Sequence, residues 1–309
     1  MSLRLRALAL YLRLVEKPYL ARATDPVEGR ARLEATARRI FPDPPGASYA
    51  RAEIGGVGGL WARCGPAIPG AAILYLHGGA FIMGSANTHR HLGAALARES
   101  GVAAFLPDYR LAPEHPHPAA LEDALAAYLG LLDAGFARIA VAGDSAGGGL
   151  GFAMVGAARK AGAPDPACLV GFSPWTDMTM RAPALRRNAW ADPMLPVARM
   201  PEVIAWRMGG GDPLDPSASP ALARFDPAPP PALIQASPSE ILADDARAMA
   251  EVLRACGGSA TLEWERGAPH AFQAFCGSVP EARAAVARAG AFIRAGLRAR
   301  PDEETGDAA

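Results

Sequence analysis

The stretch RIAVAGDSAGGG, residues 138–149, decides the fold. It begins with a short apolar run typical of a buried strand and ends where a helical pattern starts. Between the two lies Gly-Asp-Ser-Ala-Gly over 143–147, and G-x-S-x-G at a strand-to-helix turn is typical of a nucleophile elbow. Such a turn is so cramped that glycine is needed on either side of the serine. The pattern predicts Ser145 as a nucleophile, and the alternative is an ordinary turn in which Ser145 caps the helix.

Outward from this stretch, short apolar runs alternate with longer stretches of helical spacing. The predicted strands are 71–76, 102–106, 138–142, 167–172, 232–236 and 260–265. The predicted helices are 86–99, 118–133, 146–161, 197–208, 242–256 and 280–297. This alternation predicts the α/β fold class, with a mostly parallel twisted sheet and helices on both faces. Ligands bind beyond the carboxyl ends of the strands in such sheets, so the chemistry is expected in the loops that follow them.

The N-terminal region predicts a helical segment of its own. Residues 1–40 read as two helices broken between Pro18 and Pro26, and the Pro/Gly-rich run 41–46 marks a boundary. Apolar residues recur in the first helix at helical spacing; they are Leu5, Leu8, Leu12 and Val15. This stripe favours a helix that packs on its own protein, and the alternative is a targeting or membrane-surface helix.

The remaining boundaries follow from the pattern on either side. Two strand-like runs, 49–54 and 59–64, predict an antiparallel hairpin. We therefore expect an N-terminal helical segment over 1–45, a catalytic domain over 46–299 and a disordered acidic tail over 300–309.

A second motif, His77-Gly-Gly-Ala, follows the predicted strand 71–76. Acyl transfer places negative charge on an oxygen, and backbone N–H groups beside glycine can approach and stabilise it. We expect an oxyanion hole built from the N–H groups of Gly78, Gly79 and Ala146, with a plain glycine turn as the alternative. His77 precedes the nucleophile, so we interpret it as a residue that shapes the loop.

A general base is predicted at His270, just beyond the last predicted strand, because an imidazole titrates near neutrality. A third group must orient that base, and it should follow the strand 232–236. Glu240 lies in this loop and is the preferred acid. Asp244 is the second candidate, although a carboxylate at a helix start is favourable without any catalytic role. Four other histidines are interpreted as surface or packing residues; they are His89, His91, His115 and His117.

Composition excludes several classes of function. Lys+Arg and Asp+Glu both number 31, so a nucleic-acid partner is not expected. The four cysteines are spread singly, which predicts neither a structural metal nor disulfides and fits a reducing, cytoplasmic location. There is no run of 18 apolar residues, and so no membrane span is expected. Nucleotide-phosphate motifs are also missing, and no cofactor is predicted.

Five motifs together resemble the bacterial hormone-sensitive-lipase-like esterases of the α/β-hydrolase fold. They are HGGAF (77–81), DYRLAPEHPHPAALED (108–123), GDSAGG (143–148), GFSPWTDM (171–178) and PHAF (269–272). The resemblance implies an acyl-ester hydrolase with Ser145 as nucleophile, His270 as base and the N-terminal helices as a cap over the substrate pocket.

The sequence departs from that family at three places. Ala80 replaces the last glycine of the usual HGGG, which reduces tolerance of unusual backbone angles. The usual D-P-L-x-D becomes Glu240-Ile-Leu-Ala-Asp244, and aligning the two places Glu240 at the acid position. H-A-F stands where H-G-F is usual.

The resulting expectation is a soluble serine carboxylesterase that hydrolyses short-chain acyl esters through an acyl-enzyme, with a homodimer as a candidate assembly. Phe81, Met83 and Trp206 are candidates to line the substrate pocket. The alternatives are an acyltransferase of the same mechanism and a non-catalytic ligand-binding protein on the hydrolase fold. A peptidase is disfavoured, because peptidases of this fold usually carry a large extra domain.

Overall fold

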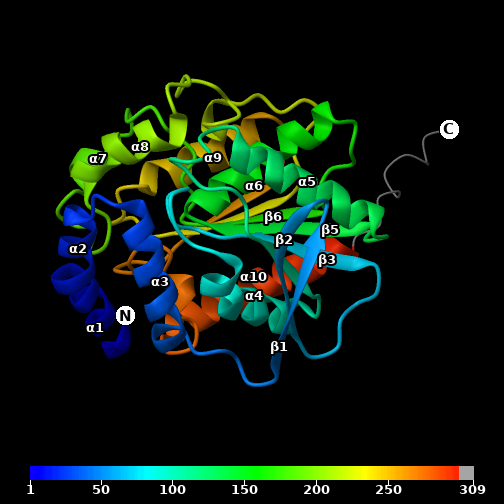
Figure 1. Ribbon diagram of the computed structural model, residues 1–309, viewed down its shortest axis with the longest axis horizontal. Helices are drawn as coiled ribbons and strands as arrows, with labels where there is room; N and C mark the ends of the chain where they lie inside the picture. The colour runs from blue at the N-terminus through cyan, green and yellow to red at the C-terminus, as the bar shows by residue number, and fades with distance from the viewer. Residues whose placement is uncertain (299–309) are drawn as a thin grey trace.

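The computed structural model describes residues 1–298, so the tail expected at 300–309 lies outside the described residues. Its centre is an eight-stranded sheet in the order β1-β2-β4-β3-β5-β6-β7-β8 (Figure 1). The strands are β1 (Ala47–Ile54), β2 (Val57–Cys64), β3 (Ala71–Leu76), β4 (Ala104–Pro107), β5 (Arg138–Asp144), β6 (Cys168–Phe172), β7 (Ala232–Ala236) and β8 (Ala260–Trp264). The β1–β2 and β2–β4 pairs are antiparallel, and the other neighbours are parallel. The predicted fold class is confirmed.

Helices cover both faces of this sheet (Figure 1). Each face has its own hydrophobic core between the sheet and its helices. On one face α4 (Ala86–Ser100) packs against α10 (Pro280–Arg298). On the other face lie α5 (Ala119–Asp133), α6 (Ala146–Lys160) and α9 (Ala243–Ala255). Strands such as β3 are buried along their whole length because both faces are covered, which is why they read as unbroken apolar runs.

The N-terminal helices break inside the predicted range, between Pro18 and Pro26. The first helical run consists of α1 (Leu3–Tyr11), a π-helical turn (Leu12–Glu16) and α2 (Lys17–Arg22), and α3 follows (Pro26–Ile40). The run therefore continues through Pro18 and breaks only after Arg22. Proline clashes with the carbonyl four residues earlier in a regular helix. The π turn, in which the Lys17 N–H bonds to the Leu12 carbonyl, widens the helix just before Pro18.

The predicted hairpin is confirmed, with a tighter turn than expected. Ile54 pairs with Val57, so only Gly55 and Gly56 form the turn. Their φ angles are 59° and 76°, the left-handed pair that a two-residue hairpin turn requires and that glycine adopts readily.

Shorter elements complete the layer above the sheet. The predicted helix 197–208 is a 3₁₀ turn (Val197–Arg199) followed by α8 (Met200–Met208). One short helix that the sequence did not predict, α7 (Ala184–Arg187), and two further 3₁₀ turns (Pro220–Leu222 and Phe272–Phe275) lie in the connections. No helix in the described part of the chain is long and apolar enough to cross a membrane.

Candidate active site

Ser145 sits on the sharp turn between β5 and α6. Its φ of 51° and ψ of −119° lie outside the favoured regions, a strain of about 1–3 kcal/mol that the surroundings must hold. Its N–H donates to the Phe172 carbonyl at 2.8 Å, which ties the turn to β6. A Cβ on Gly147 would come within 2.0 Å of the Leu76 carbonyl oxygen, and one on Gly143 within 2.6 Å of the Gly147 backbone. These contacts explain both glycines of the motif.

His270 and Glu240 form a buried pair beyond the ends of β8 and β7. His270 Nδ1 lies 2.7 Å from Glu240 Oε2, and the two side chains are 3% and 0% exposed. Burial alone would lower the pKa of His270, but the hydrogen bond and the charge of Glu240 raise it above its ordinary value. Glu240 is thus the carboxylate that contacts the predicted base.

Asp244, the second candidate acid, is used elsewhere. Its carboxylate accepts the N–H of Ala184 at 2.8 Å and pairs with Arg187 at 2.8 Å. It therefore holds the short helix α7 against the start of α9.

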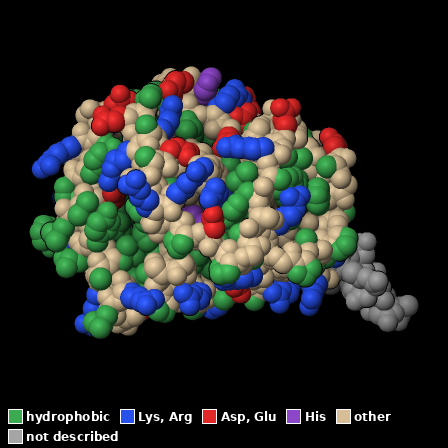
Figure 2. Space-filling view, turned by 60° about the horizontal axis from the view of Figure 1, so that its bottom comes forward, with side chains coloured by type: hydrophobic (Ala, Val, Ile, Leu, Met, Phe, Trp, Pro, Cys, Tyr) green, Lys and Arg blue, Asp and Glu red, His purple; other side chains and the backbone are tan. Residues whose placement is uncertain are grey.

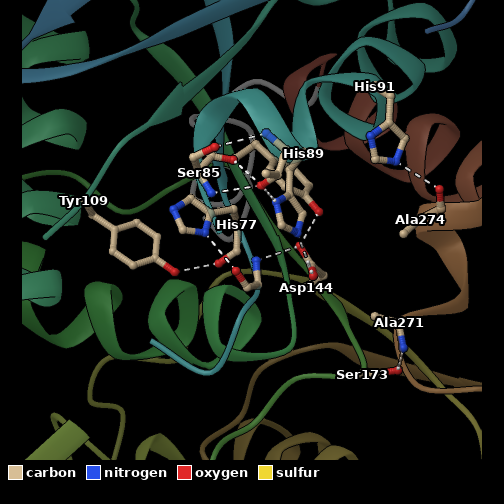
Figure 3. Close-up of polar contacts among 12 residues, drawn as sticks. His77, Ser85, His89, His91, Tyr109, Asp144, Ser173, Ala271 and Ala274 are labelled. Atoms are coloured by element: carbon tan, nitrogen blue, oxygen red, sulfur yellow. Dashed lines mark hydrogen bonds and ion pairs between the residues drawn. The ribbon is translucent and has the colours of Figure 1, made fainter. Parts of the chain in front are cut away.

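Ser173 connects the acid with Ala271, the residue that follows the base, and the sequence did not predict this link. Its hydroxyl donates to Glu240 Oε1 at 2.8 Å. The same hydroxyl accepts the N–H of Ala271 at 3.1 Å (Figure 3). The Ser237 N–H donates to the same carboxylate oxygen at 2.6 Å. The available signal was the motif GFSPWTDM, in which Ser173 stands directly after a buried strand.

The second nitrogen of His270, Nε2, is the atom that would exchange protons. It is buried and makes no hydrogen bond within residues 1–298. His270 and Ser145 line the same cavity, together with Gly79 and Ala80. The three segments predicted to carry the chemistry therefore meet in one place.

The loop after β3 corrects the predicted oxyanion hole. The Gly78 N–H donates to Asp144 Oδ1 at 3.0 Å, so it is not free to face a substrate. Gly79 and Ala80 line the cavity, and their N–H groups have no acceptor among the described residues. Ala146 begins α6, where the first N–H groups have no acceptor within the helix. The free donors are those of Gly79, Ala80 and Ala146.

This loop has an unusual backbone. Gly79 has a φ of 116°, and a Cβ there would lie 2.2 Å from the Met83 carbonyl oxygen. Ala80 and Phe81 have φ angles of 57° and 63°, a left-handed conformation that costs a non-glycine residue roughly 1–2 kcal/mol. Ala80 thus adopts a backbone conformation that the glycine usual at this position would tolerate without strain.

Asp144, the variable residue of G-x-S-x-G, fixes this loop from below (Figure 3). Besides the Gly78 N–H, its Oδ1 accepts the Tyr75 hydroxyl at 2.6 Å, and its Oδ2 lies 3.5 Å from His89 Nε2. Burial alone would raise the pKa of Asp144, but His89 and Tyr75 lower it to about 2. Burial likewise opposes the charge on His89, yet Asp144 raises the pKa of that imidazole. A buried contact between a carboxylate and an imidazole thus lies beside the nucleophile.

The other histidines of this region are buried too. His77 stacks on Tyr109 with 4.1 Å between ring centroids, and the Tyr109 hydroxyl donates to the His77 carbonyl at 2.6 Å (Figure 3). These contacts fit its expected role in shaping the loop, and burial lowers its pKa to about 3. His91 bonds to the Ala274 carbonyl at 2.9 Å. His89 and His91 are therefore interior residues and not surface residues, and both line the cavity that holds Ser145.

The cavity above the serine has a volume of about 220 Å³ and mostly apolar walls. The walls come from the N-terminal helices, the loop after β3, the segment before α8 and α8 itself; they include Leu20, Leu33, Ile82, Met83, Met194, Leu195 and Val203. Of the three predicted pocket residues, Met83 lines the cavity. Phe81 is buried beneath the guanidinium of Arg207, which lies 4.0 Å from the centre of the Phe81 ring. Trp206 lies beside the guanidinium of Arg199. Neither of these two lines the cavity.

No group of three or more His, Cys, Asp or Glu side chains that could hold a metal ion occurs in the part of the chain that the structure describes. The four cysteines are all free thiols.

Comparisons with known proteins agree with this geometry. The profile of a family described as alpha/beta hydrolase fold matches residues 73–274. An acetyl-hydrolase of Streptomyces hygroscopicus is 40% identical over 227 residues, which cover 73% of this chain and 76% of the relative. The putative acetyl-hydrolase LipR of Mycobacterium tuberculosis is 35% identical over 286 residues, or 91% of each chain.

A solved structure is similar over nearly the whole chain. The crystal structure of an esterase from the bacterial hormone-sensitive lipase family gives a TM-score of 0.90 at 36% identity, covering 96% of this chain and 99% of that one. The fold and the site define an α/β-hydrolase, and the chain belongs to the bacterial hormone-sensitive-lipase-like esterases. It is a serine ester hydrolase, and relatives named for hydrolysis do not favour an acyltransferase.

Proposed function

We propose that Ser145, His270 and Glu240 are the catalytic triad of this carboxylesterase. The observation that carries the proposal is the buried 2.7 Å hydrogen bond from His270 to Glu240, made beside a cavity that also holds the elbow serine. A carboxylate on Nδ1 fixes the tautomer in which Nε2 accepts a proton. A non-catalytic ligand-binding protein would have no need of this arrangement.

In the first half of the reaction, Ser145 Oγ attacks the ester carbonyl carbon while His270 Nε2 takes the hydroxyl proton. The N–H groups of Gly79, Ala80 and Ala146 stabilise the negative charge that develops on the carbonyl oxygen. His270 then gives its proton to the departing alcohol, and the acyl group remains on the serine.

Water completes the cycle by the same steps. It attacks the acyl carbon as His270 accepts one of its protons, and the negative charge again develops toward the oxyanion donors. The acid product leaves as Ser145 recovers its proton from His270. No metal or organic cofactor takes part in this scheme.

The substrates that we propose are esters of short acyl chains. The cavity is small and apolar, and two relatives are named acetyl-hydrolases. We further propose that residues 1–45 act as a cap, because α2 and α3 supply part of the cavity wall, and that the catalytic domain begins at residue 46. Free cysteines fit a location in the reducing cytoplasm. The assembly that we propose is a homodimer, which light scattering can test.

The roles can be tested with a panel of p-nitrophenyl esters of increasing acyl length and a serine-directed phosphonate. We expect the fastest turnover with short acyl chains, and a single phosphonyl adduct that peptide mass mapping locates on Ser145. Ser145→Ala should lower kcat by about 10³-fold or more and prevent labelling without unfolding the protein. Full activity in this variant, or a label on another serine, would remove the assignment.

A further inference from the structure

The first helical run, from α1 through the π turn, has two apolar faces, and only one of them packs on the rest of the protein. Leu5 and Leu12 are buried at 0% and 3% exposure and Leu8 packs beside the core, as their spacing predicts. Val15, the fourth member of the predicted stripe, is instead 45% exposed. On the outer face Leu3, Leu10 and Leu14 are 82%, 57% and 65% exposed. Their spacing of seven and four residues places them on one stripe of the helix.

A tryptophan extends this outer stripe. Trp190 is 85% exposed, and the Arg13 guanidinium donates to its carbonyl at 2.7 Å and lies 5.6 Å from its ring centre. Leu3, Leu10, Leu14 and Trp190 are called the N-terminal patch below. Figure 2 shows hydrophobic side chains gathered at the left, where Figure 1 places α1 and α2, with basic side chains around them.

The charge around the patch is strongly one-sided. Residues 1–22 contain five basic side chains and one acid, Glu16, whereas the whole chain is balanced at 31 of each sign. The basic residues are Arg4, Arg6, Arg13, Lys17 and Arg22. Within residues 1–298 none of the five forms an ion pair with a carboxylate, and Glu16 is already bound to Arg32 at 2.7 Å. The positive charge of this face is therefore only partly offset, by Asp192 near Lys17 and by Glu28, which lines the same surface pocket as Arg22.

A surface groove leads from the patch toward the active site. Leu14 of the patch lines it together with Val15, Pro18 and Tyr19. Ala23 lines both this groove and the cavity that holds Ser145. The same helical run thus presents apolar side chains to the surface, along the groove and, through Leu20, to the cavity.

We propose that the N-terminal patch docks on an anionic lipid surface and that the groove admits ester substrates from it. Exposed leucines and a tryptophan fringed by arginines are the composition of an amphipathic helix that lies in a lipid interface. Anionic headgroups would neutralise the cations. A second copy of the chain pairing through this face would instead bring two cationic clusters together.

The test uses the full chain and vesicles of phosphatidylcholine alone or mixed with phosphatidylglycerol, with binding measured by co-sedimentation. We expect binding to the mixed vesicles that is about tenfold tighter than to neutral ones and that weakens as salt is added. The double variant Leu3→Glu/Leu10→Glu should lose at least about tenfold in binding. Leu214→Glu/Leu222→Glu is the matched control, because these leucines are 45% and 42% exposed in another part of the chain, and it should bind like the wild type.

Hydrolysis of a soluble acetyl ester should be unchanged in both double variants, which separates docking from catalysis and reports folding. Arg6→Gln/Arg22→Gln provides an independent variant, and it should remove the preference for phosphatidylglycerol. The proposal is overturned if the wild type ignores both kinds of vesicle or if Leu3→Glu/Leu10→Glu binds like the control. It is also overturned if that variant converts a dimer to a monomer by light scattering, because the patch would then be an interface between copies.

Discussion

Glu240 holds the base through one oxygen and is itself held through the other. Oε2 meets His270, while Oε1 accepts from Ser173 and from the Ser237 N–H. A carboxylate fixed on both sides cannot rotate away from the imidazole. Glutamate is one methylene longer than aspartate, and these two donors define where its extra length is placed.

The charge of Glu240 sets the pH dependence that we predict. Only neutral His270 can accept the serine proton, so kcat/KM should rise with pH through a pKa above 6.5, because Glu240 raises that pKa. Glu240→Gln removes the charge while burial still lowers the pKa, so the midpoint should move to lower pH. We expect kcat to fall by about 10²- to 10⁴-fold in the same variant.

Full pH–rate profiles of Glu240→Gln and Asp244→Asn measure both the shift of the midpoint and the fall in kcat. Asp244→Asn is the control, because Asp244 binds Ala184 and Arg187 and not His270. Its profile should match the wild type. If kcat fell strongly in Asp244→Asn and stayed at the wild-type level in Glu240→Gln, the acid would be Asp244 and not Glu240.

His89 permits a second prediction at the residue scale. It supports Asp144, which in turn holds the Gly78 N–H and so aims the N–H groups that follow. The oxyanion forms only in the transition state, so His89→Gln should lower kcat about tenfold and leave KM nearly unchanged. Steady-state kinetics on a short-chain ester measure the split between the two constants.

His91→Gln is the matched control for this change, because His91 is also buried but bonds to the Ala274 carbonyl instead. We expect it to retain kcat. Equal losses of stability in both variants with kcat preserved in both would reduce the His89–Asp144 pair to a packing contact.

At the scale of elements, the sequence predicted best where burial is complete. The strands at 71–76 and 232–236 were predicted with their observed bounds, since helices on both faces leave an unbroken apolar run. The break in the N-terminal helices falls after Arg22, inside the predicted range from Pro18 to Pro26, but the sequence did not predict that the first run passes Pro18 by widening into a π turn. Local propensity contains no information about that adjustment.

The N-terminal helices also carry a prediction about substrate range. Leu20 and Leu33 line the cavity from α2 and α3. Leu33→Trp should fill part of its volume of about 220 Å³ and lower kcat/KM for hexanoate esters more than tenfold relative to acetate esters. The ester panel measures this ratio. Leu222→Trp, which adds the same bulk at an exposed site outside the cavity, should leave the ratio unchanged.

At the scale of the whole molecule, the sequence identified residues but not all of their contacts. Ser145, Glu240 and His270 could be found because each follows a strand at the carboxyl edge of a parallel sheet. The contact between the Gly78 N–H and Asp144 joins residues 66 positions apart, and it depends on how two loops meet in space. Motif spacing gives no distance between loops, so Gly78 was predicted as a donor that it cannot be.

The cavity walls and the reacting groups come from different parts of the chain. The reacting groups lie on loops at the ends of β3, β5, β7 and β8, whereas much of the wall comes from α2, α3, the segment before α8 and α8 itself. Evolution can therefore replace the N-terminal helices and change which esters the protein prefers, while the residues that carry out the chemical step are inherited unchanged.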